Sequence, residues 1–471
     1  MPSQIGVRIN IPYLQGAYLA LNAIPDAYFL GDGPSCVFAK AEQIHGRHDL
    51  FSTLLSCDNG HRVQHTGVNV FNIAGDCEGI IAESLRRLAA LPGCGAIFMG
   101  AMPMCSIAGT DYERVLREAL AGSRTPAFVM PRRSAISGDW LDGYAGVLEA
   151  LARGMDLSGA KRRAGQVALV GYLMDRNEGE HWGNLAELQR LLAALGLKAG
   201  SIWLSGRPYE ELRRVRHAEA VVSLPHGRAA GRLLAKRLGV RLVEAELPFG
   251  LEASRRFVEG LGRELGREAR AREVVAAELA AAAPRLQWSV PHAFLHRRFV
   301  FAGDPHYAPG FVEQIEGLGG SIVGLILMGQ PVHLTAAQRQ ALESRPHTVF
   351  EPLPHMVEWL CDAVSHEGLD LLVGNGFAFR DIKPGLKWME FGFPSECTHF
   401  LREEPFLGFQ GALAFFSRVA NETVKGLVLR PPEAPEDGAE DGAPPFPAPG
   451  GGAGTRRRTS PARRKPRRPG P

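Results

Sequence analysis

The feature that most constrains the fold is an alternation of strand and helix patterns that repeats from about residue 160 onward. A run rich in β-branched residues, 166–173, is followed by a stretch, 184–196, whose leucines recur with the 3.6-residue period of a helix. Gly196 then closes that helix, and a new apolar run begins. Alternation of this kind builds parallel sheets that helices cover on both faces. The sequence therefore predicts an α/β fold of doubly wound, Rossmann-like parallel sheets.

The same pattern covers most of the chain in three blocks. The expected strands are 26–31, one near 68–73, 95–102, 126–130, 166–173, 218–227, 240–250, 297–306, 320–329, 370–376 and 387–394. The expected helices are 79–91, 110–122, 184–196, 228–239, 311–319 and 355–368. Breaks near 154–165 and 280–294 divide the blocks into three predicted α/β domains at 1–155, 160–285 and 290–425. Residues 431–471 consist mostly of Pro, Gly, Ala and charged residues, which predicts a disordered tail.

Charge excludes one class of function for the body of the chain. Lys and Arg number 53 against 50 Asp and Glu, and the tail holds eight of the former and five of the latter, so the rest carries 45 of each. Nucleic-acid binding needs clustered positive charge, which makes that role unlikely for the body. The Arg-rich end of the tail either contacts nucleic acid or an acidic partner, or is a solubilising extension.

Cysteine usage and hydropathy indicate the compartment. Seven cysteines, at 36, 57, 77, 94, 105, 361 and 397, are few and scattered, which favours a reducing cytoplasm over a disulfide scaffold. No apolar run has the length of a membrane-spanning helix, and the first residues do not resemble a signal peptide. We therefore expect a soluble, cytoplasmic protein with no membrane contact.

Four loops after predicted strands carry unusual residues, and ligands of α/β sheets bind beyond the carboxyl ends of strands. These loops are GDGPSC (31–36), GAMPMCSIAGTD (100–111), SLPHGR (223–228) and FGFPSECTHF (391–400). Cysteines at strand–loop junctions, such as Cys36 and Cys105, can hold an iron–sulfur cluster as thiolates, although a free cysteine is more often a small buried apolar residue. One polar stretch carries His45, His48, His61 and His65 together with Cys57, and it is either a metal locus or a solvated loop or lid.

Several common catalytic motifs are missing from the sequence. It contains no CxxC pair, no HExxH, no GxSxG elbow and no Gly-Lys dipeptide, so it has no Walker A motif. The chain is therefore not expected to hydrolyse ATP by itself, and any ATP-dependent step requires a partner.

Together these loops resemble those of the nitrogenase component 1 family, which includes nitrogenase catalytic subunits, cofactor-assembly scaffolds and the dark-operative protochlorophyllide reductase. The resemblance extends through most of residues 10–425. It rests on GAYLALNAIPDAYFLGDGPSC (16–36), SIAGTDYERV (106–115), the series from NLAELQRLLAALGLKAG through LPFGLEAS, and GFPSECTHFLREEPFLGFQGALAFF (392–416). The family has three doubly wound α/β domains, so the resemblance implies the same fold as the strand and helix pattern.

The resemblance also implies cluster ligands, and here the sequence departs from the family. Cys36 matches one of the cysteines that hold the cluster at the subunit interface. The family's preceding cysteine falls near Pro12 or Tyr13 and is missing, and its third falls at Pro103, with Cys105 two residues later. An orthodox eight-iron cluster is therefore not expected. The resemblance leaves a [4Fe–4S] cluster shared across a dimer, with Cys36 and Cys105 of each chain, or one for which a partner supplies most ligands.

A second metallocofactor is the other possibility that the resemblance raises. His399 stands seven residues after Gly392 and matches the histidine that coordinates nitrogenase's iron–molybdenum cofactor. The cysteine that binds the same cofactor falls near Ser223, and His226 lies three residues beyond. His399 has an alternative reading as a loop histidine that bonds the backbone.

The function that the resemblance implies is one subunit of a two-component oxidoreductase. A separate P-loop iron protein would hydrolyse ATP and deliver low-potential electrons to a cluster near Cys36, and from there to an unidentified substrate near Ser223, His226 and His399. The chain would pair with a copy of itself or with a paralogous subunit. The alternatives are a non-catalytic scaffold for metallocofactor assembly and a structural partner subunit without a cluster.

Overall fold

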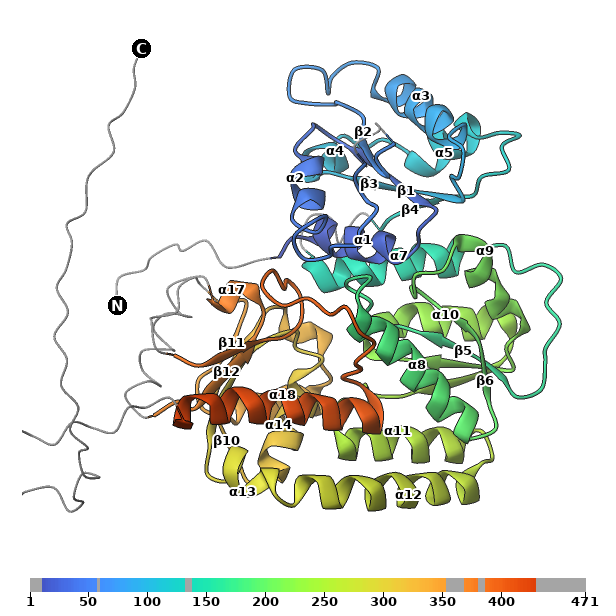
Figure 1. The fold of residues 1–471 in the computed structure, drawn as a ribbon. Coiled ribbons are helices and arrows are strands. Elements are labelled where there is room, and N and C mark those ends of the chain that lie inside the picture. Colours follow the sequence, from blue (N-terminus) through green and yellow to red (C-terminus); the bar gives the residue numbers. More distant parts are fainter. Residues whose placement is uncertain (1–10, 57–59, 132–137, 353–367, 380–385, 429–471) are drawn as a thin grey trace, which may run out of the picture. The chain divides into compact units, whose positions relative to one another are not determined.

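The computed structural model describes residues 11–56, 60–131, 138–352, 368–379 and 386–428 (Figure 1). The chain divides into two units, 1–428, which contains all the described residues, and 429–471. The predicted disordered tail at 431–471 and the predicted helix at 355–368 lie mostly or wholly outside the described residues.

Three separate parallel sheets form the framework of the first unit. The first has the order β2-β1-β3-β4, with β1 Ala27–Asp32, β2 Val63–His65, β3 Ala96–Ala101 and β4 Ala127–Val129. The second has the order β6-β5-β7-β8, with β5 Gln166–Val170, β6 Lys198–Ile202, β7 Ala220–Ser223 and β8 Arg241–Glu244. The third has the order β11-β10-β9-β12-β13, with β9 Arg298–Gly303, β10 Ser321–Leu327, β11 Thr348–Phe350, β12 Leu371–Gly374 and β13 Trp388–Glu390. The predicted α/β class with three doubly wound parallel sheets is confirmed.

Helices follow most of the strands, as parallel connections require. In the first block they are α1 Tyr13–Asn22, α2 Val37–Glu42, α3 Cys77–Ala89, α4 Pro103–Ile107, α5 Tyr112–Ala119 and α7 Trp140–Gly154. In the second they are α8 Gly179–Ala194, α9 Tyr209–Leu212, α10 Arg228–Leu238, α11 Leu251–Glu264 and α12 Glu268–Leu286. In the third they are α13 Ser289–Ala293, α14 Ala308–Gly317, α15 Ala336–Glu343, α17 Gly376–Phe379 and α18 Gly408–Val428.

Two glycines allow α1 and α7 to pack with their backbones in contact, side by side in Figure 1. A Cβ at Gly16 would lie 1.6 Å from the carbonyl oxygen of Trp140, and a Cβ at Gly143 would lie 1.9 Å from that of Tyr13. Any side chain at either position would therefore push the two helices apart. Asp139 fixes the start of α7, because it forms a capping box with Asp142.

The strand order places a topological switch point in each sheet, where the chain reverses the direction in which it adds strands. The switch points lie between β1 and β3, between β5 and β7, and between β9 and β12. Loops at the carboxyl ends of such strands diverge and leave room for ligands. The loops that carry Cys36, Cys105 and His226 all follow strands at these switch points.

Two details of the sequence-based prediction are wrong. The strand expected near 68–73 is instead β2 at Val63–His65, and residues 70–74 form turns. The predicted boundary at 280–294 contains the end of α12, which continues through Pro284, and the short helix α13. The helix expected from residue 184 begins at Gly179. No helix among the described residues has both the length and the apolar character to cross a membrane.

Candidate functional site

Cys36 lies at the carboxyl edge of the first sheet, four residues after β1 and directly before α2. Its side chain is exposed. Met102, which follows β3, donates its backbone N–H to the carbonyl of Asp32 at 2.9 Å, so the loops after β1 and β3 lie together. The loop that carries Cys36 therefore occupies the switch point of the first sheet.

Cys105 follows β3 by the same four residues, but its side chain points into the protein. It is only 1% exposed and packs in a core cluster with Cys77 and Leu85. Burial raises the pKa of the Cys105 thiol to about 12, and the carboxylate of Asp32 contributes to the rise. A metal ligand must be the thiolate, so Cys105 in this position is a poor ligand.

Three exposed apolar side chains lie in the segments that follow β2 and β3. Val70 and Phe71, in the loop after β2, are 70% and 94% exposed, and Ile107 at the end of α4 is 77% exposed. Since β2 and β3 are the two neighbours of β1, these side chains belong to loops on both sides of the Cys36 loop. Exposed apolar side chains that gather at one place are typical of a surface that contacts another protein.

The described cysteines supply only part of a cluster site. Cys36 is an exposed thiol, whereas Cys105 and Cys77 are buried in the core. Cys397 is exposed, but partial desolvation of its thiol and the nearby carboxylates of Glu390 and Glu396 raise the pKa of that thiol. A four-iron cluster takes four ligands, usually thiolates. Cys36 therefore fits one ligand of a cluster that a second chain must help to complete, and one chain alone does not fit the whole group.

A second candidate site lies where the second and third sheets meet. His226 is in the loop after β7, and its backbone neighbour Gly227 packs directly against Gly171, which follows β5. A Cβ on Gly171 would lie 2.4 Å from the Gly227 nitrogen, and Gly171 has a φ of +90°, which favours glycine. These two glycines bring the two loops of the second switch point together and hold His226 at the sheet edge.

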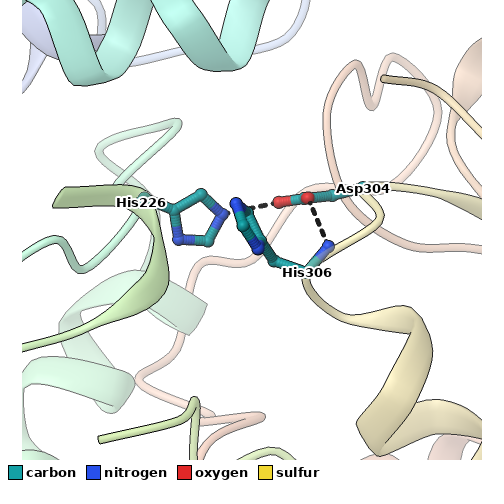
Figure 2. A group of neighbouring side chains, drawn as sticks. All are labelled: His226, Asp304 and His306. Atoms are coloured by element: carbon teal, nitrogen blue, oxygen red, sulfur yellow. Dashed lines mark hydrogen bonds and ion pairs between the residues drawn. The ribbon is translucent and has the colours of Figure 1, made fainter. Parts of the chain in front are cut away.

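The imidazole of His226 meets two side chains from the loop after β9 (Figure 2). Its Nε2 is 2.7 Å from Oδ2 of Asp304, and its ring centroid is 4.6 Å from that of His306. The other Asp304 oxygen accepts the backbone N–H of His306 at 2.8 Å, which fixes the carboxylate. Nitrogen and oxygen ligand atoms of the three residues all lie within 4.8 Å of one another. Two imidazoles and one carboxylate thus converge from two sheets.

Burial sets the protonation of this group. His226 and Asp304 are each 3% exposed. Burial alone would raise the pKa of Asp304, but the neighbouring imidazole of His226 and its hydrogen bond outweigh it and lower that pKa. Burial, followed by the nearby His226, lowers the pKa of His306 well below its usual value. Asp304 is therefore an anion and His306 a neutral imidazole at neutral pH.

A second histidine–carboxylate pair, formed by His333 and Asp139, lies next to His306. His333 Nε2 lies 2.8 Å and 2.9 Å from the two oxygens of Asp139, and the His333 ring is 6.1 Å from that of His306. The Asp139 carboxylate also accepts backbone N–H groups of Leu141, Asp142 and Gln330. Helix capping and loop anchoring thus already occupy this carboxylate.

Ser223 ends β7, but its side chain turns away from His226. A Cβ on Gly231 in α10 would lie 2.4 Å from Ser223 Oγ, so the hydroxyl packs against that helix. Ser223 Oγ is buried and has no hydrogen-bond partner within the described part of the chain. Ser223 is therefore close to His226 in sequence, but its side chain does not belong to the cluster of His226, Asp304 and His306.

His399 belongs to a different polar group. Its Nδ1 is 2.7 Å from Oε1 of Glu178, which precedes α8 and is fully buried. Glu178 also accepts the backbone N–H of Phe400, and Arg176 donates to the carbonyl of Thr398 at 2.8 Å. Arg176 in addition bonds Glu180 through Nε at 2.7 Å. These bonds join the loop after β13 to the loop after β5. In the His399 ring, Nδ1 makes the contact with Glu178.

The polar stretch with His45, His48 and His61 packs partly into the core. His48 is fully buried, and its Nδ1 accepts the backbone N–H of Ser395 at 2.9 Å. Its Nε2 lies 3.9 Å from Asp175, whose other close partner is His181 at 2.5 Å. Burial lowers the pKa of His48, and Asp175 only partly offsets that effect. The stretch is therefore neither wholly solvated nor gathered around one site.

Sequence reasoning missed Asp304, His306 and His333. Asp304 and His306 were included in the strand predicted at 297–306, whereas β9 ends at Gly303 and both residues begin the next loop. The signal was present in the sequence, because GDPH directly follows a buried strand. Nothing in the sequence, however, indicates that this loop faces the loop of His226.

Comparisons with known proteins agree with the fold. The sequence matches the family described as Nitrogenase component 1 type Oxidoreductase over residues 13–423. A solved structure, "Nitrogenase Cp1 at pH 6.5", superposes with a TM-score of 0.72 at 15% identity and covers 91% of this chain and 94% of that one. "Nitrogenase Cp1 at pH 5" gives 0.67 at 14% identity, with 92% of each chain covered. The comparison with curated proteins finds no match. At such low identity the structural likeness supports the fold alone, and the family match across most of the chain shows that this protein belongs to the nitrogenase component 1-type oxidoreductases.

Proposed function

We propose that this chain is a subunit of a two-component, ATP-dependent reductase that receives low-potential electrons from a separate P-loop iron protein. The observation that carries the proposal is the exposed thiol of Cys36 at the switch point of the first sheet, between loops that expose Phe71 and Ile107. The family match supports an oxidoreductase of this type. The chain contains no Walker A motif, so the ATP-hydrolysing protein must be a separate one.

Cys36 is the chain's own ligand in this proposal. A [4Fe–4S] cluster bound there would supply one-electron transfer at low potential. The second chain covers Val70, Phe71 and Ile107 and contributes the remaining ligands. It is a paralogue in this proposal, because a copy would add only its own Cys36. Covering these apolar side chains also removes water from around the thiolate. Electrons leave toward a substrate at the carboxyl edges of the second and third sheets, where His226 and His399 lie.

The test is anaerobic isolation of the native assembly followed by iron and sulfide analysis and electron paramagnetic resonance. We expect about four irons per pair of chains, as a [4Fe–4S] cluster requires, and a signal from the reduced cluster. Cys36→Ala should remove both. Cys105→Ala should retain both, because that thiol is buried away from the edge. Equal iron content in the wild type and in Cys36→Ala would refute the assignment of Cys36.

A second variant separates the loss of a ligand from the loss of assembly. Phe71→Ser leaves Cys36 in place but removes a side chain that is 94% exposed in one chain. An aromatic side chain at the centre of an interface contributes about 2 kcal/mol or more to association. We expect Phe71→Ser to dissociate the assembly and lose iron, whereas Cys36→Ala should lose iron and stay assembled. An iron-loaded assembly of Phe71→Ser would contradict the proposed interface.

A second candidate function is a scaffold for metallocofactor assembly or a partner subunit without a cluster. The burial of Cys105 favours it, because one exposed thiol at this edge is too few for a cluster held by a single chain. A transferable metal cluster without turnover, when an iron protein and ATP are supplied, would indicate the scaffold. An absence of iron both in the isolated chain and in the native assembly would indicate the structural subunit.

A further inference from the structure

We propose that His226, Asp304 and His306 form a site for one divalent transition-metal ion such as Zn²⁺ or Fe²⁺. The proposal goes beyond the function at Cys36 and does not depend on it, since no cysteine takes part. Two imidazoles and one carboxylate are ligands that suit zinc and non-haem iron, and three protein ligands leave positions open for water or a substrate.

The geometry already brings the ligands together. Their ligand atoms lie within 4.8 Å of one another, and Figure 2 shows His226 reaching Asp304 and His306 from the opposite side. Metal–nitrogen and metal–oxygen bonds of about 2.0–2.2 Å require ligand atoms about 3–4 Å apart, so small side-chain shifts are enough. The ion would replace the proton between His226 Nε2 and Asp304 Oδ2, now 2.7 Å apart, and that proton would pass to solvent.

Unmet hydrogen-bonding capacity distinguishes this group from an ordinary ion pair between two sheets. His226 Nδ1 is buried without a partner, and the half-buried ring of His306 makes no hydrogen bond with any residue that the structure describes. One hydrogen bond thus serves the four ring nitrogens of His226 and His306. Buried polar groups are nearly always paired, and an exception indicates an unseen water or ion. Because the proposed ion takes Nε2 of His226, a water would satisfy Nδ1, and the ion would use the unpaired ring of His306. Asp139 and His333 lack this property, because Asp139 is saturated by capping bonds.

The position also fits a functional ion rather than a structural one. His226 follows β7 and the other two ligands follow β9, and each of these strands borders the switch point of its sheet. Ligands of open α/β sheets bind at such points. The ion would join the loop after β7 in the second sheet to the loop after β9 in the third.

The experiment uses the full-length chain without an affinity tag, stripped with a chelator and then titrated with Co²⁺, whose visible absorption reports the coordination geometry. We expect saturation at one Co²⁺ per chain and a rise in the midpoint of thermal unfolding, since binding to the folded state alone stabilises it. Loss of an outer partner of a metal ligand costs about 10–100-fold in affinity, so His306→Ala should weaken Co²⁺ binding by at least that factor.

His306→Ala is preferred over a His226 variant because the His306 ring makes no hydrogen bond with the described residues whose loss would unfold the protein. His306→Gln provides a second test of similar size. His333→Gln is the matched control and should bind Co²⁺ like the wild type. Cys36→Ala should also bind normally, which separates this site from the proposed cluster. Zn²⁺ or Fe²⁺ in the protein as isolated, lost in His306→Ala, would support the site. Unchanged Co²⁺ binding in His306→Ala and Asp304→Asn would overturn it.

Discussion

The two candidate sites of this protein differ in how much of each one chain provides. At the carboxyl edge of the first sheet, the chain offers one exposed thiol, Cys36, among exposed apolar side chains. Between the second and third sheets, His226, Asp304 and His306 converge within one chain; the first two are buried and His306 is half-buried. The first region provides one thiol ligand and one side of an interface, whereas the second provides two imidazoles and a carboxylate from the same chain. The contrast suggests that assembly controls the first site and folding controls the second.

The largest difference between a buried and an exposed region should appear in the free energy of unfolding when a charged side chain is removed. Arg176 is 2% exposed and is a cation beside Glu178 and Glu180, which are also buried. Arg176→Ala leaves these carboxylates without it, and breaking a buried pair costs about 3–5 kcal/mol. We expect a loss of that size in the free energy of unfolding, measured with urea. Arg232→Ala, which breaks the exposed pair with Glu244, should cost less than about 1 kcal/mol. Similar losses in both variants would contradict the view that the region around Arg176 is stabilised by buried charge pairs.

Acid should lower the stability of the folded protein through His48, which is fully buried. Burial lowers the pKa of His48 in the folded state, whereas the unfolded chain has the ordinary value of about 6.5. The unfolded state therefore binds a proton more readily, so stability is full above about pH 6.5 and falls as the pH drops below it. Asp175, whose pKa is also lowered, acts in the same direction at more acidic pH. Thermal unfolding midpoints from pH 8 to 5 should fall less in His48→Gln, and an identical fall would exclude His48 as a cause.

Ser223→Ala should have the smallest effect. The hydroxyl is buried against Gly231 and lacks a partner within the described residues, so its removal should change the free energy of unfolding by less than about 1 kcal/mol, with a tendency to stabilise. Metal content should stay at the wild-type level. Loss of metal in Ser223→Ala would mean that Ser223 faces the site, contrary to its contact with α10.

The sequence predicted the sheets and most of their loops, because alternating strand and helix patterns depend on local composition. It did not predict α1, since all ten residues of this helix are buried and it shows no amphipathic stripe. The direction of Ser223 was equally hidden. All four residues of β7 are buried, so no alternation of polar and apolar residues reveals which face each side chain occupies.

The sites depend on contacts that are distant in sequence, and these were the hardest to predict. Cys36 and Cys105 stand at the same spacing after their strands, yet one is exposed and the other is in the core. His226 and Asp304 are 78 residues apart, and His399 and Glu178 are 221 apart. A single sequence shows which loops carry reactive side chains, but only the packing of one sheet against another shows which loops meet.

The most direct test of the account is to separate monomers from assembled chains under anaerobic conditions and to measure metal in each fraction. We predict that both fractions bind one Co²⁺ per chain at the site of His226, Asp304 and His306, whereas iron and sulfide occur only in the assembled fraction. Iron and sulfide in the monomer at the level of the assembly, or Co²⁺ binding confined to the assembly, would contradict the division between a site that one chain completes and a site that requires two.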